Sequence, residues 1–212
     1  MYKAILSLLI ICVFFQIQAF SQKRGVDQGF GLLGSVADIN GLARTSTDSS
    51  FKDIDYTVRV KQIGIVYSIR KDLISWNGGS ISVGSPMMLG VSFTNRYRSI
   101  DFDGTKRDTI QGKKGGHLAF ELPLVADLNI GLTSASEDSK RRLGFYIGGG
   151  YQYSYTKIYT TIGKIAFSGF DPVLRAGIRM GKTWQTRWSL GFNMRGTSAT
   201  NRTYSIHWLK EL

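Results

Sequence analysis

Apolar residues recur at every second position along residues 118–132 of the chain. The positions between them include Glu121, Asp127, Asn129 and Gly131. Successive side chains of a β-strand point to opposite faces, whereas an α-helix repeats every 3.6 residues. The pattern therefore predicts a strand with one apolar face and one polar face. The apolar positions are Leu118, Phe120, Leu122, Leu124, Ala126, Leu128, Ile130 and Leu132.

The same alternation recurs in seven further segments, which makes eight predicted strands in all. They are residues 81–93 and 143–156, with the clearest patterns, and residues 29–37, 58–70, 170–180, 187–195 and 204–208. An even number of such strands predicts a closed, all-β, eight-stranded antiparallel up-and-down transmembrane β-barrel, with lipid outside and a polar lumen. Because periodicity alone does not say which face is inside, a soluble lipocalin-like periplasmic binding barrel stays as a less favoured alternative.

Two irregularities interrupt the alternation. Val58 and Val60 share one parity and Ile63 and Ile65 the other, which predicts a β-bulge near residues 61–62. Proline cannot donate to a ladder hydrogen bond, and a closed barrel offers it no free edge. We therefore expect bulges to absorb the prolines that fall inside predicted strands, which are Pro86, Pro123 and Pro172.

The first 21 residues have the pattern of a secretion signal. Lys3 precedes an apolar run over residues 4–15, and Ala19 and Ser21 put small residues at the cleavage positions. A helix needs about 20 apolar residues to cross a bilayer, so this run is short for a membrane anchor. We predict a signal peptide over residues 1–21, a barrel domain over residues 22–212, and export to the cell outer membrane. Cys12 lies in the signal, so we expect neither disulfides nor thiolate metal sites in the mature chain.

Connection lengths and aromatic residues agree with a membrane barrel. Long connections at residues 38–57 and 95–116 fall on the predicted outer side, as outer-membrane barrels prefer. Amphipathic rings collect at the two membrane interfaces. The tryptophans Trp76, Trp184, Trp188 and Trp208 fall near the predicted periplasmic rim, and the tyrosines Tyr56, Tyr97, Tyr155, Tyr159 and Tyr204 near the outer one.

Three short phrases carry a resemblance to a known family. They are Ser-Pro-Met-Met-Leu-Gly at residues 85–90, Glu-Leu-Pro-Leu at residues 121–124 and Gly-Phe-Tyr-Ile-Gly-Gly-Gly at residues 144–150. In these the chain resembles the PorT-like small outer-membrane β-barrel proteins of Bacteroidetes. The resemblance implies a single barrel in the outer membrane of a Gram-negative bacterium and, for some members, accessory roles in secretion or surface assembly. It carries over no catalytic residue.

Charged residues on the predicted inward face form a lumen polar cluster. Eight strands make a barrel just wide enough for its own side chains to fill, so we expect a charged plug, with water or loop carboxylates balancing the excess arginine. A narrow channel for small solutes is the main alternative. The cluster consists of Arg59, Lys61, Glu121, Asp127, Arg175, Arg179, Arg187 and Arg195.

An enzymatic reading would have to use His117 or His207. Ser205 and His207 share a face, but residues two apart on a strand lie about 6.6 Å apart. A nucleophile and its base need about 2.6 to 3.2 Å. His117 opens a strand after Lys113 and Lys114, where a solvated histidine is expected. We therefore predict no catalysis, and because metal-ligand and phosphate-binding motifs are absent from the sequence, no metal and no cofactor.

The formal net charge of +12 suggests anionic partners. An exported barrel does not routinely meet nucleic acid, and lipopolysaccharide phosphates supply an adequate counter-charge. We predict a monomer that contacts outer-membrane lipid and lipopolysaccharide, with an envelope or secretion-system protein as a further partner. Asp-Gly is a hairpin signal, so a ribbon between the third and fourth strands is the predicted partner-facing element. Its residues are Arg96, Arg98, Asp103, Gly104, Lys106 and Arg107.

Overall fold

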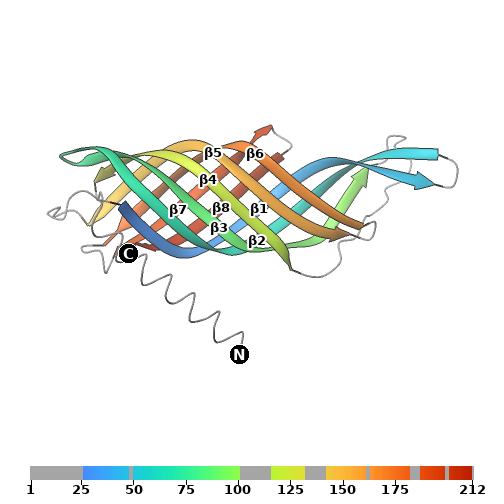
Figure 1. The fold of residues 1–212 in the computed structure, drawn as a ribbon, viewed down its shortest axis with the longest axis horizontal. Helices are drawn as coiled ribbons and strands as arrows, with labels where there is room; N and C mark the ends of the chain where they lie inside the picture. Colours follow the sequence, from blue (N-terminus) through green and yellow to red (C-terminus); the bar gives the residue numbers. More distant parts are fainter. Residues whose placement is uncertain are drawn as a thin grey trace, which may run out of the picture.

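A computed structural model describes residues 26–47, 50–100, 116–131, 142–160, 163–181, 187–198 and 201–211. Each strand pairs antiparallel with its neighbours in sequence, and the last pairs with the first, which closes the barrel (Figure 1). This confirms the predicted all-β, eight-stranded, up-and-down barrel. The strands are β1 (Val26–Thr47), β2 (Ser50–Trp76), β3 (Gly79–Ile100), β4 (His117–Gly131), β5 (Leu143–Thr160), β6 (Gly163–Met180), β7 (Trp188–Ser198) and β8 (Asn201–Glu211). The predicted signal segment lies outside the described residues.

The apolar face of each strand points outward and the polar face points inward. On β4, Leu124 is 65% exposed, whereas Asp127 and Asn129 are buried in the interior. Ile147 and Phe170 are exposed to a similar extent on β5 and β6. This is the reverse of the soluble lipocalin-like alternative, which would bury the apolar face. No helix in the described part of the chain is long and apolar enough to cross a membrane.

The predicted bulge near residues 61–62 is wrong. Side chains alternate without interruption from Arg59 to Ile65, so Val60 and Gln62 point inward and are buried. The register against β3 instead shifts between Val58 and Val60. Because no residue is inserted after Val60, Arg59 and Lys61 lie on the exposed outer face and do not belong to the lumen polar cluster.

Strands continue past the closed part of the barrel in two places. β5 and β6 remain paired as far as Thr160 and Gly163, beyond the first β6–β7 pair at Val173. The longer extension is formed by β1, β2 and β3. The β1–β8 ladder reaches Asp38, but β1 remains paired with β2 as far as Thr47. On β3, residues beyond Ser92 pair with β2 as far as Ile100. This ribbon, formed by residues 39–47, 50–58 and 94–100, projects at the right of Figure 1. Residues 38–57, predicted as a loop, are therefore mostly strand, and the described ribbon consists of parts of β1, β2 and β3. The turn and return of the ribbon predicted between the third and fourth strands, residues 101–115, lie outside the described residues.

The prolines fit the barrel without bulges, contrary to our expectation. Gly84 pairs with Val125 and Met88 with Glu121, so the β3–β4 register is unchanged across the prolines. This register places Pro86 opposite Pro123. The backbone N–H groups that the two prolines lack are therefore absent from one short interruption of the β3–β4 ladder. There the Ser85 hydroxyl donates a hydrogen bond to the Pro123 carbonyl. Pro172 pairs with Tyr151 on β5 and lies just beyond the first β6–β7 pair, at Val173.

Glycines allow close approach between β2 and β3. Gly64 pairs with Gly90, and both face the barrel interior. A Cβ atom on Gly90 would collide with the Ile63 carbonyl and the Gly64 Cα atom. Gly34 on β1 differs, since nothing lies within 4 Å of the position of its Cβ atom.

We predict that Gly90→Ala destabilises the barrel by about 1–3 kcal/mol, because overpacking against backbone forces the strands apart. Gly34→Ala is the matched control and should leave stability unchanged or slightly higher. Urea unfolding of each purified protein in detergent, followed by tryptophan fluorescence, measures both. Equal unfolding midpoints for the two variants would contradict the close contact between β2 and β3.

Candidate functional site

The inward polar side chains gather into a hollow at the barrel end that carries Val26 and Glu211. The hollow has an empty volume of about 400 Å³, part of which is open to solvent. Strands β1, β2, β4, β5, β6 and β8 all contribute to its charged or aromatic lining, because alternate residues of each strand face the lumen. These lining residues are Asp27, Arg70, Asp127, Tyr146, Arg175, Arg179 and Glu211.

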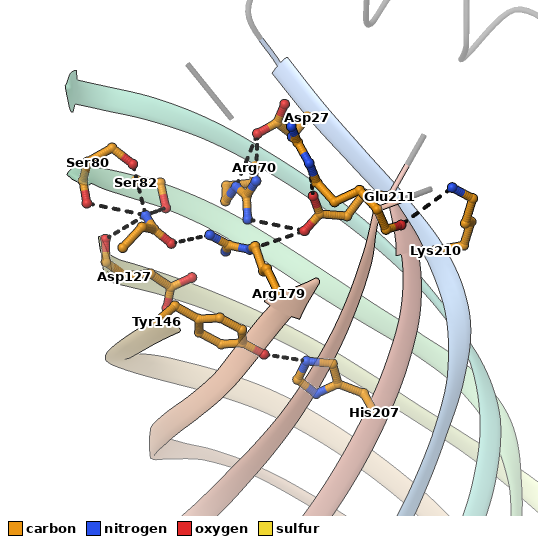
Figure 2. Close-up of polar contacts among 12 residues, drawn as sticks. Asp27, Arg70, Ser80, Ser82, Asp127, Tyr146, Arg179, His207, Lys210 and Glu211 are labelled. Atoms are coloured by element: carbon orange, nitrogen blue, oxygen red, sulfur yellow. Dashed lines mark hydrogen bonds and ion pairs between the residues drawn. The ribbon is translucent and has the colours of Figure 1, made fainter. Parts of the chain in front are cut away.

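Glu211 is the centre of the ion pairs in this hollow. Its Oε1 atom lies 3.1 Å from Arg179 Nε and 3.7 Å from Arg70 Nη1, and its Oε2 atom lies 3.6 Å from Arg187 Nε. Arg70 also reaches Asp27, with 2.7 Å between Nη2 and Oδ2 (Figure 2). Guanidinium groups from β2, β6 and the segment before β7 therefore share one carboxylate at the end of β8.

A second set of contacts holds the β4 side of the hollow. Arg175 Nε lies 3.4 Å from Asp127 Oδ1, and both side chains are buried. Arg179 Nη1 donates to Asn129 Oδ1, and Asn129 Nδ2 donates to Ser82 Oγ at 2.9 Å. Figure 2 shows Ser82, Asp127 and Arg179 on this side of the hollow, on β3, β4 and β6. Arg179 thus joins the Glu211 ion pairs to the β4 amide.

Tyr146 crosses the lumen between these groups. The guanidinium carbons of Arg175 and Arg179 lie 4.8 Å and 4.7 Å from its ring centroid, within cation–π range. The Tyr146 hydroxyl and His207 Nε2 are 2.9 Å apart. A Cβ atom on Gly177 or Gly191 would strike the Tyr146 ring or hydroxyl, so these two glycines provide the space for it.

The rest of the lumen is also filled. Arg195 Nε lies 3.9 Å from Asp171 Oδ2, and Arg195 Nη2 donates to Thr203 Oγ1 at 2.8 Å. Gln62 bridges Ser35 and Thr156 by hydrogen bonds of 2.8 Å and 2.6 Å. An apolar cluster is buried inside the barrel as well, formed by Leu33, Val66, Met88, Ala119 and Leu209. This packing favours a plugged interior over the narrow-channel alternative.

The structure separates the predicted lumen polar cluster into two groups. The inward group lies among the ion pairs and polar contacts of the lumen, and consists of Glu121, Asp127, Arg175, Arg179, Arg187 and Arg195. Arg59 and Lys61 are outside, and Arg59 forms an exposed bidentate pair with Asp38. Arg70, Asp27 and Glu211 also line the lumen but are not among the residues predicted from the sequence. Arg70 could have been found from parity, since it shares the even positions of Gln62 and Val66.

The predicted partner-facing residues are only partly described. Arg96 and Arg98 lie on the outer part of β3, where Arg98 pairs in register with Thr57 of β2. Asp103, Gly104, Lys106 and Arg107 lie outside the described residues. The site hypothesis for this segment is therefore a prediction that the described strands neither support nor oppose.

The residues weighed for catalysis make structural contacts. Asn193 Nδ2 donates to Ser205 Oγ at 3.2 Å and lies 3.5 Å from His207 Nδ1. With Tyr146 on its other nitrogen, His207 is buried and held on both sides. Within the described strands and turns, no three His, Cys, Asp or Glu side chains are grouped as metal ligands.

Solved structures resemble this barrel in fold, and no protein-family model and no curated protein sequence matches the chain. The attachment invasion locus protein Ail of Yersinia pestis shares 9% identity over 89% of this chain and 99% of its own, with a TM-score of 0.48. Ail in complex with the heparin analogue sucrose octasulfate gives 9% identity, coverage of 88% and 97%, and a TM-score of 0.47. Neisserial surface protein A (NspA) shares 9% identity over 89% of this chain and 96% of its own, with a TM-score of 0.40.

We predict that Glu211→Gln destabilises the barrel by about 3–5 kcal/mol, because Arg70, Arg179 and Arg187 would lose a shared buried counter-charge. Asp38→Asn removes a carboxylate from an exposed arginine pair and should change stability little, since water screens that pair. Urea unfolding midpoints in detergent measure both variants. A similar loss of stability in the two variants would show that the effect of Glu211→Gln does not come from the burial of Glu211.

Proposed function

We propose that this protein is a monomeric outer-membrane β-barrel that acts through surface interactions at one end and performs no chemistry of its own. The observation that carries the proposal is the apolar belt around the closed sheet. Large apolar side chains on all eight strands are exposed on the outer face, including Leu32, Ile65, Leu89, Leu124, Ile147, Phe170, Leu190 and Ile206. A water-soluble protein rarely exposes a continuous apolar surface of this extent, whereas membrane barrels require one.

Aromatic residues support the membrane assignment. Trp188 and Trp208 stack on the outer face with ring centroids 4.9 Å apart, and Lys210 Nζ lies 5.4 Å from the Trp188 ring. Trp76 is exposed at the same end of the barrel. Indole rings and lysines of this kind are favoured at the interface between lipid and water.

The ends of the barrel suggest its orientation. Val26 and Glu211 lie at one end together with the two-residue β2–β3 turn at Asn77 and Gly78, and the ribbon lies at the other. Outer-membrane barrels have short periplasmic turns and larger extracellular parts. We therefore assign the ribbon to the cell surface and the Glu211 end to the periplasm, with residues 1–21 as the export signal.

The filled interior and the ribbon favour a scaffold role. Ion pairs and hydrogen bonds across the lumen hold together the barrel from which the ribbon projects. Functional residues commonly lie on projecting segments held by a rigid frame. The role we propose for this end is contact with lipopolysaccharide, whose phosphates balance the basic charge of the chain, and with a secretion or envelope-assembly protein, as the PorT-like resemblance implies.

We predict that the purified protein runs faster on gels without boiling than after boiling, and that it fractionates with outer membranes. Leu124→Arg places a cation in the middle of the apolar belt, where it costs about 2–4 kcal/mol in a lipid-exposed barrel. This variant should insert poorly into vesicles, whereas Thr47→Arg on the ribbon should insert normally. Recovery of the unaltered protein in the soluble periplasm, with no mobility shift, would refute the membrane proposal.

We also predict that replacing residues 41–56 by Asn-Gly keeps the barrel but removes its surface role. Asn40 and Thr57 are paired, so a two-residue turn can join them. The shortened protein should keep its mobility shift. In a host strain that lacks the protein, it should fail to restore secretion, surface assembly and envelope integrity to the level restored by the full chain. Full restoration would mean that the ribbon is not the working part.

A further inference from the structure

Three outward cations gather where the ribbon leaves the barrel. Asp38 of β1 pairs in register with Arg59 of β2 on one side and with Arg202 of β8 on the other. Lys61 lies two residues along β2 from Arg59. All three basic side chains are exposed on the outer face. We call Arg59, Lys61 and Arg202 the outer cation cluster.

The spacing of the outer cation cluster suits a single anionic group. Neighbouring strands lie about 4.8 Å apart, so Arg59 and Arg202 start about 10 Å apart on either side of Asp38. Lys61 starts about 7 Å from Arg59 along the strand. Arginine and lysine side chains are long enough to converge on one phosphate from such positions. The planar guanidinium groups favour phosphate oxygens because they can donate two parallel hydrogen bonds.

Asp38 neutralises only part of this positive charge. It accepts hydrogen bonds from Arg59 Nε at 2.7 Å and Nη2 at 2.9 Å, which occupies one edge of the guanidinium. Arg59 is still 66% exposed, and an arginine carries five N–H groups in all. Arg59 can therefore hold Asp38 and a second anion together.

The surroundings of Lys61 indicate that the anion is attached to the membrane. Lys61 pairs in register with Val36 on one side and Phe93 on the other, and both are exposed apolar side chains. Ile63 continues this apolar surface toward the barrel centre. A lysine at the edge of a lipid-facing belt is favourable only when its stem lies along the acyl chains and its ammonium group reaches the headgroups.

We infer that the outer cation cluster is a binding site for the phosphorylated headgroup of an outer-leaflet lipid of the lipid A type. The acyl chains of this lipid would lie on Val36, Ile63 and Phe93. The inference rests on the proposed outer-membrane location and names one partner of the surface end. The site lies on β1, β2 and β8, and the predicted partner-facing residue Arg96 lies on the neighbouring part of β3, between the pairs Val58–Tyr97 and Val60–Thr94.

Lipid binding by the detergent-purified protein tests this inference, with diphosphorylated lipid A in mixed micelles as the probe. A cation near an anionic membrane surface contributes roughly fivefold to affinity. The variant with Arg59→Gln, Lys61→Gln and Arg202→Gln should therefore bind on the order of 100-fold more weakly. Lys71→Gln alters an exposed lysine at the other end of the same strand and should bind within about twofold of the unaltered protein.

Asp38→Asn gives a result in the opposite direction. Removal of the carboxylate between Arg59 and Arg202 should tighten lipid A binding roughly fivefold, which loss of a merely structural pair would not do. Dephosphorylated lipid A should bind all variants equally weakly. If inorganic phosphate alone binds as tightly as lipid A, the lipid part of the inference is wrong.

The mobility shift on gels separates this inference from the proposed function. Equal lipid A affinity in the unaltered and triple variants, with the shift intact in both, would overturn the lipid site and leave the membrane barrel in place. Absence of the shift in the unaltered protein would refute the membrane barrel itself. If the triple variant does not fold, Lys61→Gln and Asp38→Asn decide alone, because the inference requires weaker binding by the first and tighter binding by the second.

Discussion

The β1–β8 ladder is the contact on which the rest of the structure depends, because it removes both free edges of the sheet. Ten register pairs from Gly29–Glu211 to Asp38–Arg202 join the first strand to the last. In lipid, each unpaired backbone group would cost several kcal/mol, so a sheet can span a membrane only when it closes. Closure at eight strands also sets the width of the lumen, which the inward side chains then have to fill.

The charges of the lumen follow from that width. Arginines from β2, β6 and the segment before β7 point into the narrow lumen, where an unpaired buried charge is very unfavourable. Glu211 meets three of them because the β1–β8 ladder brings the end of β8 to the same end of the barrel as Asp27 and Arg70. Tyr146 stacks under two arginines and reaches His207 across the lumen. The result is a braced cylinder in place of an open pore.

The two ends of the barrel differ because its strands differ in length. The β7 and β8 strands have 11 residues each, which is enough for one crossing, whereas β2 has 27. The additional length lies on one side and forms the ribbon. Arg59, Lys61 and Arg202 occupy the boundary between the lipid-facing surface and the ribbon. Strand length and outward charge together thus mark the end of the molecule that we propose lies at the cell surface.

Alternation along the chain was enough to predict the strand number and which face of most strands is apolar, because a period of two is a local property of extended backbone. It also assigned Asp127, Arg175 and Arg179 to the interior. It could not assign Arg59 and Lys61, since the apolar Val60 can be explained either by a bulge or by an inward valine. Only the packed lumen, in which Val60 is fully buried, decides between them.

The register between neighbouring strands likewise could not be predicted from the sequence. Three prolines within strands suggested bulges, yet Pro86 and Pro123 face each other across one ladder, and this depends on how two strands align. The meeting of Glu211 with Arg70, Arg179 and Arg187 depends on closure of the whole sheet. The period of alternation, the apolar face of each strand and the composition are local properties that neighbouring residues determine. The choice of partner across the lumen is a long-range property, and only the tertiary structure decided it.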